Sequence, residues 1–137
     1  MESELFTWSE TYHLGISFAD VQHKQLADSI NRLHRALLNA QDRMLVGRAM
    51  EELFAYSKAH FTAEEKVLRS YGYPDFAAHH SGHECMSFAV LELYQKLMSR
   101  ELLMNSYSVS FLKEWLSEEI LSADSKFTPF LKGKRVP

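Results

Sequence analysis

Four stretches of the sequence repeat apolar residues at intervals of three and four, which is the spacing of one face of an α-helix. These stretches cover about residues 20–40, 43–70, 74–99 and 107–131. Only five glycines and three prolines occur in the whole chain, so little would interrupt long helices. Residues 1–19 carry apolar side chains without sustained helical spacing and are expected to form an N-terminal arm. We therefore predict an all-α fold, an antiparallel up-and-down four-helix bundle preceded by an arm.

The predicted helix ends carry recognisable local signals. Asp20 and Asp42 are each expected to cap the helix that follows, because their carboxylates can accept from its first free backbone N–H groups. The second helix is expected to end at Gly72, because glycine tolerates left-handed dihedral angles. Pro74 then suits the first turn of the third helix.

Length and composition narrow the class of protein. A chain of 137 residues suits one domain, spanning residues 1–137. The net charge of −3 offers no basic face for nucleic acid, and no apolar run approaches the ~18 residues that a membrane span needs. One cysteine excludes an internal disulfide framework and a cysteine-rich zinc site. The acidic start does not suit a signal peptide, so we expect a cytoplasmic protein with neither nucleic acid nor membrane as a partner.

Polar residues interrupt the apolar face of every predicted helix. A buried polar group without a partner costs about 1–3 kcal/mol, whereas a domain has only about 5–15 kcal/mol of net stability. Several such groups are compatible with folding only if a cation satisfies them together. The inward-facing imidazoles and carboxylates are His23 on the first helix, His60 and Glu64 on the second, His79 and His83 on the third, and Glu119 and Asp124 on the fourth.

The residue types and their spacing favour a particular metal. The pairs His60–Glu64 and His79–His83 are each four residues apart, which places donors about 5–6 Å apart on one helix face. Nitrogen and oxygen donors without a thiolate suit iron or manganese, and helix-bundle cores are where carboxylate-bridged di-iron sites are built. A single zinc ion needs only three or four ligands, which would leave the remaining groups unpartnered. The sequence therefore favours a dinuclear iron site.

The remaining histidines and the cysteine are expected to lie outside this site. His80 follows His79 by one residue, about 100° around a helix, and should flank the bundle or face outward. His34 lies at the edge of the first apolar face, where it either packs or is solvated. His13 belongs to the arm and is expected at the surface. Cys85 is expected to be a small buried apolar residue.

These residues, in this order, resemble the hemerythrin family, and in particular bacterial hemerythrin-like domains. The likeness covers nearly the whole chain and extends to the C-terminal domain of bacterial methyl-accepting chemotaxis receptors, which would make a fused signalling receptor a partner. The matching motifs are Trp8 with Leu14-Gly15-Ile16, Asp20-Val21-Gln22-His23, His60-Phe61-Thr62-Ala63-Glu64-Glu65, Tyr73-Pro74, His79-x-x-x-His83, and Trp115-Leu116 ahead of Asp124.

The resemblance implies a non-haem di-iron centre, with an oxo or hydroxo bridge, that binds O₂ reversibly for carriage, storage or sensing. Small anions would be alternative ligands. The roles that it implies are that Glu64 and Asp124 bridge the two irons, His23 and His60 hold the iron that is open to O₂, His79 and His83 hold the other iron, and Trp115 and Leu116 line the O₂ pocket.

One position departs from the family pattern Trp-Leu-x-x-His-Ile-x-x-x-Asp: Glu119 stands where the family has a fifth histidine. Because position 119 is seven residues after Leu112 and three after Leu116, it should face inward, and we expect Glu119 to be an iron ligand. The alternative is that Glu119 turns to solvent and leaves a damaged site. As an anionic ligand it would stabilise Fe(III) over Fe(II), so we expect it to favour autoxidation.

Three functions remain open at this point. The chain is expected to bind O₂ for sensing or carriage. A carboxylate-rich iron site could instead act as a peroxidase-like enzyme, and a bundle of this kind could also be a metal store or purely structural. Iron content together with an absorption spectrum would separate the three.

Overall fold

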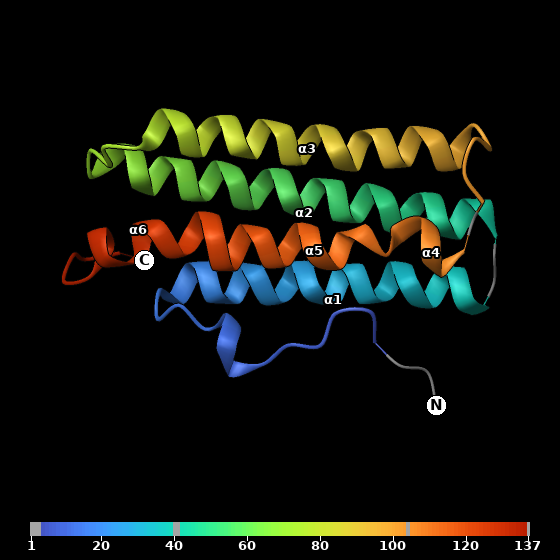
Figure 1. The fold of residues 1–137 in the computed structure, drawn as a ribbon, viewed down its shortest axis with the longest axis horizontal. Helices are drawn as coiled ribbons and strands as arrows, with labels where there is room; N and C mark the ends of the chain where they lie inside the picture. The colour runs from blue at the N-terminus through green and yellow to red at the C-terminus, as the bar shows by residue number, and fades with distance from the viewer. Residues whose placement is uncertain (1–3, 40–41, 104, 137) are drawn as a thin grey trace.

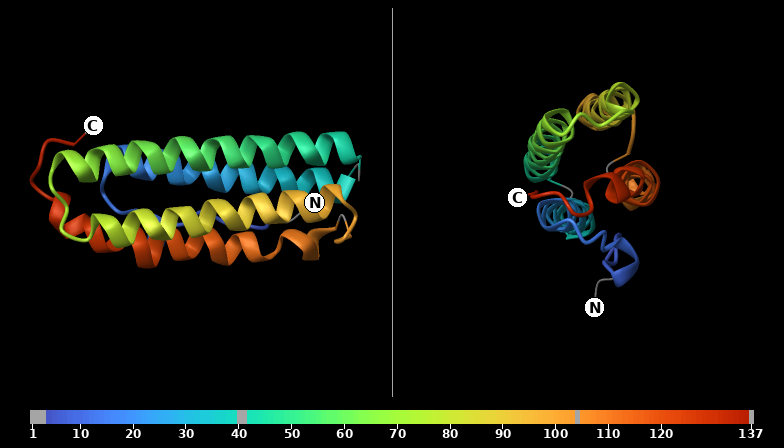
Figure 2. Two further views of the ribbon diagram at one scale, coloured as in Figure 1. Left: turned by 90° about the horizontal axis from the view of Figure 1, so that it is seen from above. Right: turned by 90° about the vertical axis from the view of Figure 1, so that its left-hand side faces the viewer.

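The computed structural model describes residues 4–39, 42–103 and 105–136. Within these ranges every regular element is helical, and the helices form an antiparallel four-helix bundle (Figure 1), which confirms the predicted fold class. Seen end-on, the four rods surround a common centre (Figure 2). The elements are η1 (Glu10–Tyr12), α1 (Ser17–Asn39), α2 (Arg43–Ser70), α3 (Phe76–Met98), α4 (Ser106–Val109), α5 (Phe111–Glu118), a π-helical segment (Glu119–Asp124) and α6 (Ser125–Leu131).

The fourth rod of the bundle is not one regular helix. The sequence predicts a continuous helix over about 107–131, but α4, α5 and α6 are joined by a turn and by the π-helical segment. Together they run back alongside α1 (Figure 1). A π-helical turn inside an α-helix is rare and frequently marks a functional site.

The two predicted caps have different outcomes. Asp42 caps α2 as expected, because its carboxylate accepts from the backbone N–H of Met44 at 2.8 Å. The prediction for Asp20 is wrong, since α1 already begins at Ser17. The carboxylate of Asp20 instead accepts from the backbone N–H groups of Leu14 and Gly15, at 2.8 and 3.0 Å. Asp20 therefore fixes the loop before the helix.

The expected turn after α2 is present. Gly72 has a φ of +70°, in the left-handed region that glycine tolerates, and it follows Tyr71, the C-cap residue of α2. The third helix begins at Phe76, so the prediction that Pro74 lies in its first turn is wrong, and Pro74 lies in the turn before it.

The arm before α1 is attached to the bundle at a buried point. The backbone N–H of Phe6 donates to Oδ1 of Asn31 at 2.9 Å, and Nδ2 of Asn31 donates to the carbonyl of Phe6 at 2.8 Å. Both residues are buried, and the Phe6 ring packs in the main apolar core. The arm is therefore part of the folded structure.

Two apolar clusters fill the bundle. The larger one contains Leu33, Leu53 and Leu112, and the smaller one contains Leu68 and Phe127. On each of the four rods, buried polar residues lie between the two clusters. The centre of the bundle is therefore a polar layer with apolar packing above and below it.

Two further observations concern the surface. The prediction that Cys85 is buried is wrong, because its side chain is exposed. Cys85 follows the inward-facing His83 by two residues, which turns it about 200° around α3. No helix in the described ranges is both long enough and apolar enough to span a bilayer.

Candidate metal centre

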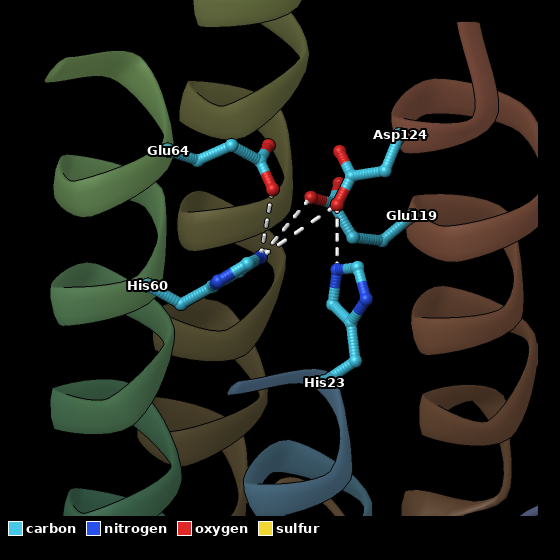
Figure 3. A group of neighbouring side chains, drawn as sticks. All are labelled: His23, His60, Glu64, Glu119 and Asp124. Atoms are coloured by element: carbon cyan, nitrogen blue, oxygen red, sulfur yellow. Dashed lines mark hydrogen bonds and ion pairs between the residues drawn. The ribbon is translucent and has the colours of Figure 1, made fainter. Parts of the chain in front are cut away.

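The structure brings all seven inward-facing polar residues into one buried cluster. They form two overlapping groups, and within each group one nitrogen or oxygen atom per residue lies within 4.8 Å of the others. The three carboxylates belong to both groups, so the cluster has two ends that share their acidic members. The first group, drawn in Figure 3, is His23, His60, Glu64, Glu119 and Asp124, and the second is Glu64, His79, His83, Glu119 and Asp124.

The π-helical segment explains how Glu119 and Asp124 come together. Residues five apart lie about 140° apart on a regular α-helix, which would separate these two side chains. A π-helix hydrogen-bonds residues five apart and so turns them toward the same side. Figure 3 shows both carboxylates directed at the same point. Sequence spacing did not reveal this segment, because apolar periodicity carries no signal for a single wider turn.

Two carboxylates each divide their oxygens between the two groups. Oε2 of Glu64 lies 3.1 Å from Nε2 of His60, whereas Oε1 lies 2.5 Å from Nε2 of His79. In Asp124, Oδ2 lies 2.6 Å from Nε2 of His23, and Oδ1 lies 3.3 Å from Nε2 of His79. This is the arrangement that a carboxylate needs to bridge two metal ions.

Glu119 is placed differently. Its Oε1 lies 3.2 Å from Nε2 of His83 and 3.6 Å from Nε2 of His60. The same oxygen therefore faces both groups, and Oε2 has no hydrogen-bond partner among the described residues. The side chain is fully buried, so Glu119 does not turn to solvent.

Several nitrogen and oxygen atoms of the cluster that could bind a metal have no hydrogen-bond partner. Within the described part of the chain, Nε2 of His60, Oε2 of Glu64, Oε2 of Glu119 and Oδ1 of Asp124 are buried without a hydrogen-bond partner. Such atoms are costly unless something else binds them. Cations bound here would satisfy the unpartnered atoms of His60, Glu64 and Asp124, and imidazole nitrogens combined with carboxylate oxygens suit iron. The residues present therefore fit iron.

Neighbouring carboxylates raise the pKa values of two histidines in the cluster, and burial lowers the pKa of a third. Burial alone would lower the pKa of His60, but Glu64 and Glu119 outweigh it and raise the pKa to about 9. Burial would also lower the pKa of His83, but hydrogen bonds to Glu119 and Glu64 raise it to about 10. Burial lowers the pKa of His23 to about 4, with a further contribution from His60. Before a metal binds, two imidazoles thus hold protons that a metal would replace.

The pKa values of two carboxyl groups in the cluster are lowered, and the pKa of the third is raised. Burial would raise the pKa of Glu64, but His60 holds it well below its usual value. Burial and Glu64 would raise the pKa of Glu119, but the neighbouring imidazoles of His60 and His83 lower it to about 2. Burial, together with Glu64 and Glu119, raises the pKa of Asp124 well above its usual value. In the metal-free cluster, protons on His60 and His83 therefore offset the negative charges of Glu64 and Glu119, and Asp124 is neutral because it keeps its own proton.

Two residues that the sequence did not single out orient the histidines. Nδ1 of His60 donates to Oε1 of Gln22 at 2.7 Å. Nδ1 of His83 donates to Oε2 of Glu65 at 2.8 Å, and Nδ1 of His80 donates to the other oxygen of Glu65 at 2.5 Å. Such partners fix the tautomer, so that Nε2 of His60 and of His83 is free to bind a metal. The sequence signal for them is their position next to His23 and Glu64, within the motifs that resemble the family.

The other histidines lie outside the cluster. His13 is exposed and lies 3.3 Å from Asp20. His34 is buried in α1, so of its two expected environments packing is the one observed. His80 is about half exposed, but its contact with Glu65 connects it to the cluster.

The two residues of the expected O₂ pocket are buried in the larger apolar cluster. Nε1 of Trp115 donates to the carbonyl of Met86 at 3.1 Å. Two cavities reach His83 in the described part of the chain, and neither Trp115 nor Leu116 lines them. The pocket remains a prediction.

Comparisons with known proteins agree with this geometry. The Hemerythrin HHE cation binding domain family matches residues 14–131. The bacteriohemerythrin of Methylococcus capsulatus is 31% identical over 130 residues, covering 94% of this chain and 98% of its own. The myohemerythrin of Theromyzon tessulatum is 26% identical over 131 residues, covering 96% and 94%. The crystal structure of a wild-type hemerythrin superimposes with a TM-score of 0.82 at 31% identity, covering 91% and 96%. The chain therefore belongs to the hemerythrin family.

Proposed function

We propose that this chain holds two iron ions in its polar layer and binds O₂ through them. The observation that carries the proposal is the pair of overlapping donor groups, which share three carboxylates and differ in their histidines. The membership in a cation-binding family and the likeness to bacteriohemerythrins support the same assignment.

The proposed roles follow from the distances between donor atoms. Glu64 and Asp124 bridge the two ions, because each directs one oxygen at each group. Glu119 replaces the fifth histidine and binds through Oε1, beside His83. The remaining ligands are His23 and His60 for one ion and His79 and His83 for the other.

An iron pair supplies the electrons that O₂ takes up on binding, and the chain supplies the surroundings. The ring of Phe61 stacks on the imidazole of His83 with 4.1 Å between centroids. Phe127 lies against His79 with 5.5 Å between centroids. These two rings pack against the two histidines of the second group and give that end of the cluster apolar neighbours.

The first test is metal analysis combined with spectroscopy. Protein reduced without oxygen should contain about two irons per chain, and exposure to air should produce a visible charge-transfer band that disappears on degassing. Glu64→Ala and Asp124→Ala should each abolish loading of the second ion, because a bridge is lost while the histidines remain buried. Two irons in either variant would contradict the ligand assignment.

The matched control for these variants is His13→Gln. His13 is exposed and lies in the arm, so its loss should leave both iron content and spectrum unchanged. A variant that loses iron would show that the arm, rather than the polar layer, governs metal binding.

Peroxidase-like activity is a second candidate function. The observation in its favour is the third carboxylate, Glu119, which belongs to both groups. Turnover of hydrogen peroxide with an electron-donating dye would support it, with two electrons and two protons converting each peroxide to two waters. A protein that binds iron without either reaction would instead be a metal store or a structural bundle.

We further propose that the chain serves oxygen carriage or sensing in the cytoplasm. Sensing would require a signalling partner, and the likeness of its motifs to chemotaxis-receptor domains supports that use. Hydrogen exchange of the arm with and without O₂ is a suitable test. Faster exchange at Phe6 in one state would favour sensing, and identical exchange would favour carriage.

A further inference from the structure

A cavity of about 170 Å³ lies between α3 and the π-helical segment. Its wall includes three members of the candidate metal centre, His79, His83 and Glu119. A larger cavity between α2 and α3 contains one member in the described part of the chain, His83, and there Glu65 already occupies Nδ1. The smaller cavity is therefore the one that adjoins the donor atoms.

Gly82 forms part of the wall of this cavity. It lies in the interior of α3, where glycine is a poor helix former. Neither packing nor backbone geometry requires a glycine here, because a Cβ at this position would have no described atom within 4 Å. At this position the wall of the cavity therefore consists of backbone alone, and a larger side chain would add atoms to it.

The wall also contains a polar group that needs a partner. Glu119 is fully buried, and its Oε2 has no hydrogen-bond partner among the described residues. Lys126 and Asp75, which are exposed and also belong to the wall, carry opposite charges that offset one another. The wall is mostly apolar and contains one buried acceptor, so it suits a small uncharged ligand that donates a hydrogen bond.

We propose that this cavity is a binding site for small neutral hydrogen-bond donors of the size of hydrogen peroxide, with Glu119 as their acceptor. The inference rests on the proposed iron centre and adds a second approach to it, separate from the apolar region around Trp115 and Leu116. A volume of 170 Å³ suffices, since a single water needs only about 10–15 Å³ of such space.

The first experiment measures binding without redox chemistry. Protein loaded with zinc, which does not change oxidation state, is titrated with hydrogen peroxide while amide resonances are recorded. The resonances of Ala78, Gly82 and Ala123 should shift together, because all three line the cavity. Shifts confined to other residues, or none at all, would overturn the proposal.

The second experiment closes the cavity. A helical side chain leans over the preceding turn, so leucine at position 82 would cover Ala78 and His79. In Gly82→Leu, hydrogen peroxide should oxidise the diferrous protein about tenfold more slowly, because the leucine side chain would obstruct the cavity through which peroxide reaches the iron pair. Each peroxide takes one electron from each Fe(II), gains two protons and leaves as two waters. The rate of O₂ binding should stay unchanged.

Three controls make the outcome unambiguous. Ala77→Leu adds the same side chain on an exposed part of α3 outside the wall and should have no effect. Gly82→Ala should fold at least as stably as the parent chain and guards against a leucine variant that misfolds. Equal peroxide rates in Gly82→Leu and Ala77→Leu, with two irons loaded, would overturn this inference alone. Failure of the parent chain to load iron would overturn the proposed function with it.

Discussion

Oε1 of Glu119 lies 3.2 Å from Nε2 of His83, and both side chains are buried in the polar layer. In this chain a carboxylate thus occupies the place of a neutral imidazole in the family pattern. Its charge acts at short range and with little screening, since buried charges interact far more strongly than exposed ones. We therefore expect iron bound here to be biased toward the ferric state.

The first prediction concerns this charge. In Glu119→His, the O₂-bound protein should decay to the diferric form about tenfold more slowly, which corresponds to about 1.4 kcal/mol in the barrier. The visible absorption band of aerated protein, followed over time, measures the decay.

Glu119→Gln is the control that separates charge from shape. Glutamine has the size of glutamate without its charge, so it should slow the decay in the same direction as histidine. A glutamine variant that decays as fast as the parent chain would show that geometry, and not charge, sets the lifetime.

Much of this centre could be predicted from sequence because helical spacing determines direction. His60 and Glu64 are four residues apart on a regular helix, and so are His79 and His83, so their shared direction follows from the pattern alone. The structure brings these residues together with the other inward-facing polar groups. The bundle itself follows from the same spacing of apolar residues.

Other features depend on contacts that a pattern does not contain. The π-helical turn that unites Glu119 and Asp124 leaves the apolar spacing around it almost unchanged. Asp20 has the sequence position of a cap, but its carboxylate accepts from the loop because α1 starts one turn earlier. Glu65 lies about 100° from Glu64 around the helix, so the spacing within α2 does not place it in the site. It contacts His83 because α3 lies beside α2.

The second prediction concerns Glu65, which accepts from Nδ1 of His83 and of His80. Glu65→Gln should lower iron affinity about 10–100-fold, the usual effect of losing a partner that orients a ligand. Competition with a chelator measures the affinity. His80→Gln is the matched control and should have a much smaller effect, because Glu65 keeps its bond to His83. Equal losses in both variants would show that His80 is part of the metal site.

The third prediction concerns pH. The pKa values of His60 and His83 are raised to about 9 and about 10 from an ordinary value of 6.5. In metal-free protein, their contribution to stability is therefore complete below about pH 6.5 and is lost as pH rises through about 9 to 10. Metal binding must displace these protons, so iron affinity should rise over the same range.

Urea unfolding of metal-free protein at pH 6.5 and pH 10, together with chelator competition at both, measures the two trends. The metal-free protein should be less stable at the higher pH while iron binding is tighter. If the stability of the metal-free protein and its iron affinity both rose or both fell between these pH values, the assignment of the two protons to His60 and His83 would be wrong. His83→Gln should weaken both trends, because it removes one of the two titrating rings.

The last prediction concerns the arm. Asn31 is buried and pairs with both the N–H and the carbonyl of Phe6. In Asn31→Ala, both backbone groups lose their partners, and at about 1–1.5 kcal/mol for each bond the chain should lose about 2–3 kcal/mol of stability. Urea unfolding measures the loss, and limited proteolysis should cut first within the arm. Iron content should not change, because Asn31 lies two helical turns beyond His23. An unchanged unfolding midpoint would show that the Phe6 ring, and not these hydrogen bonds, holds the arm in place.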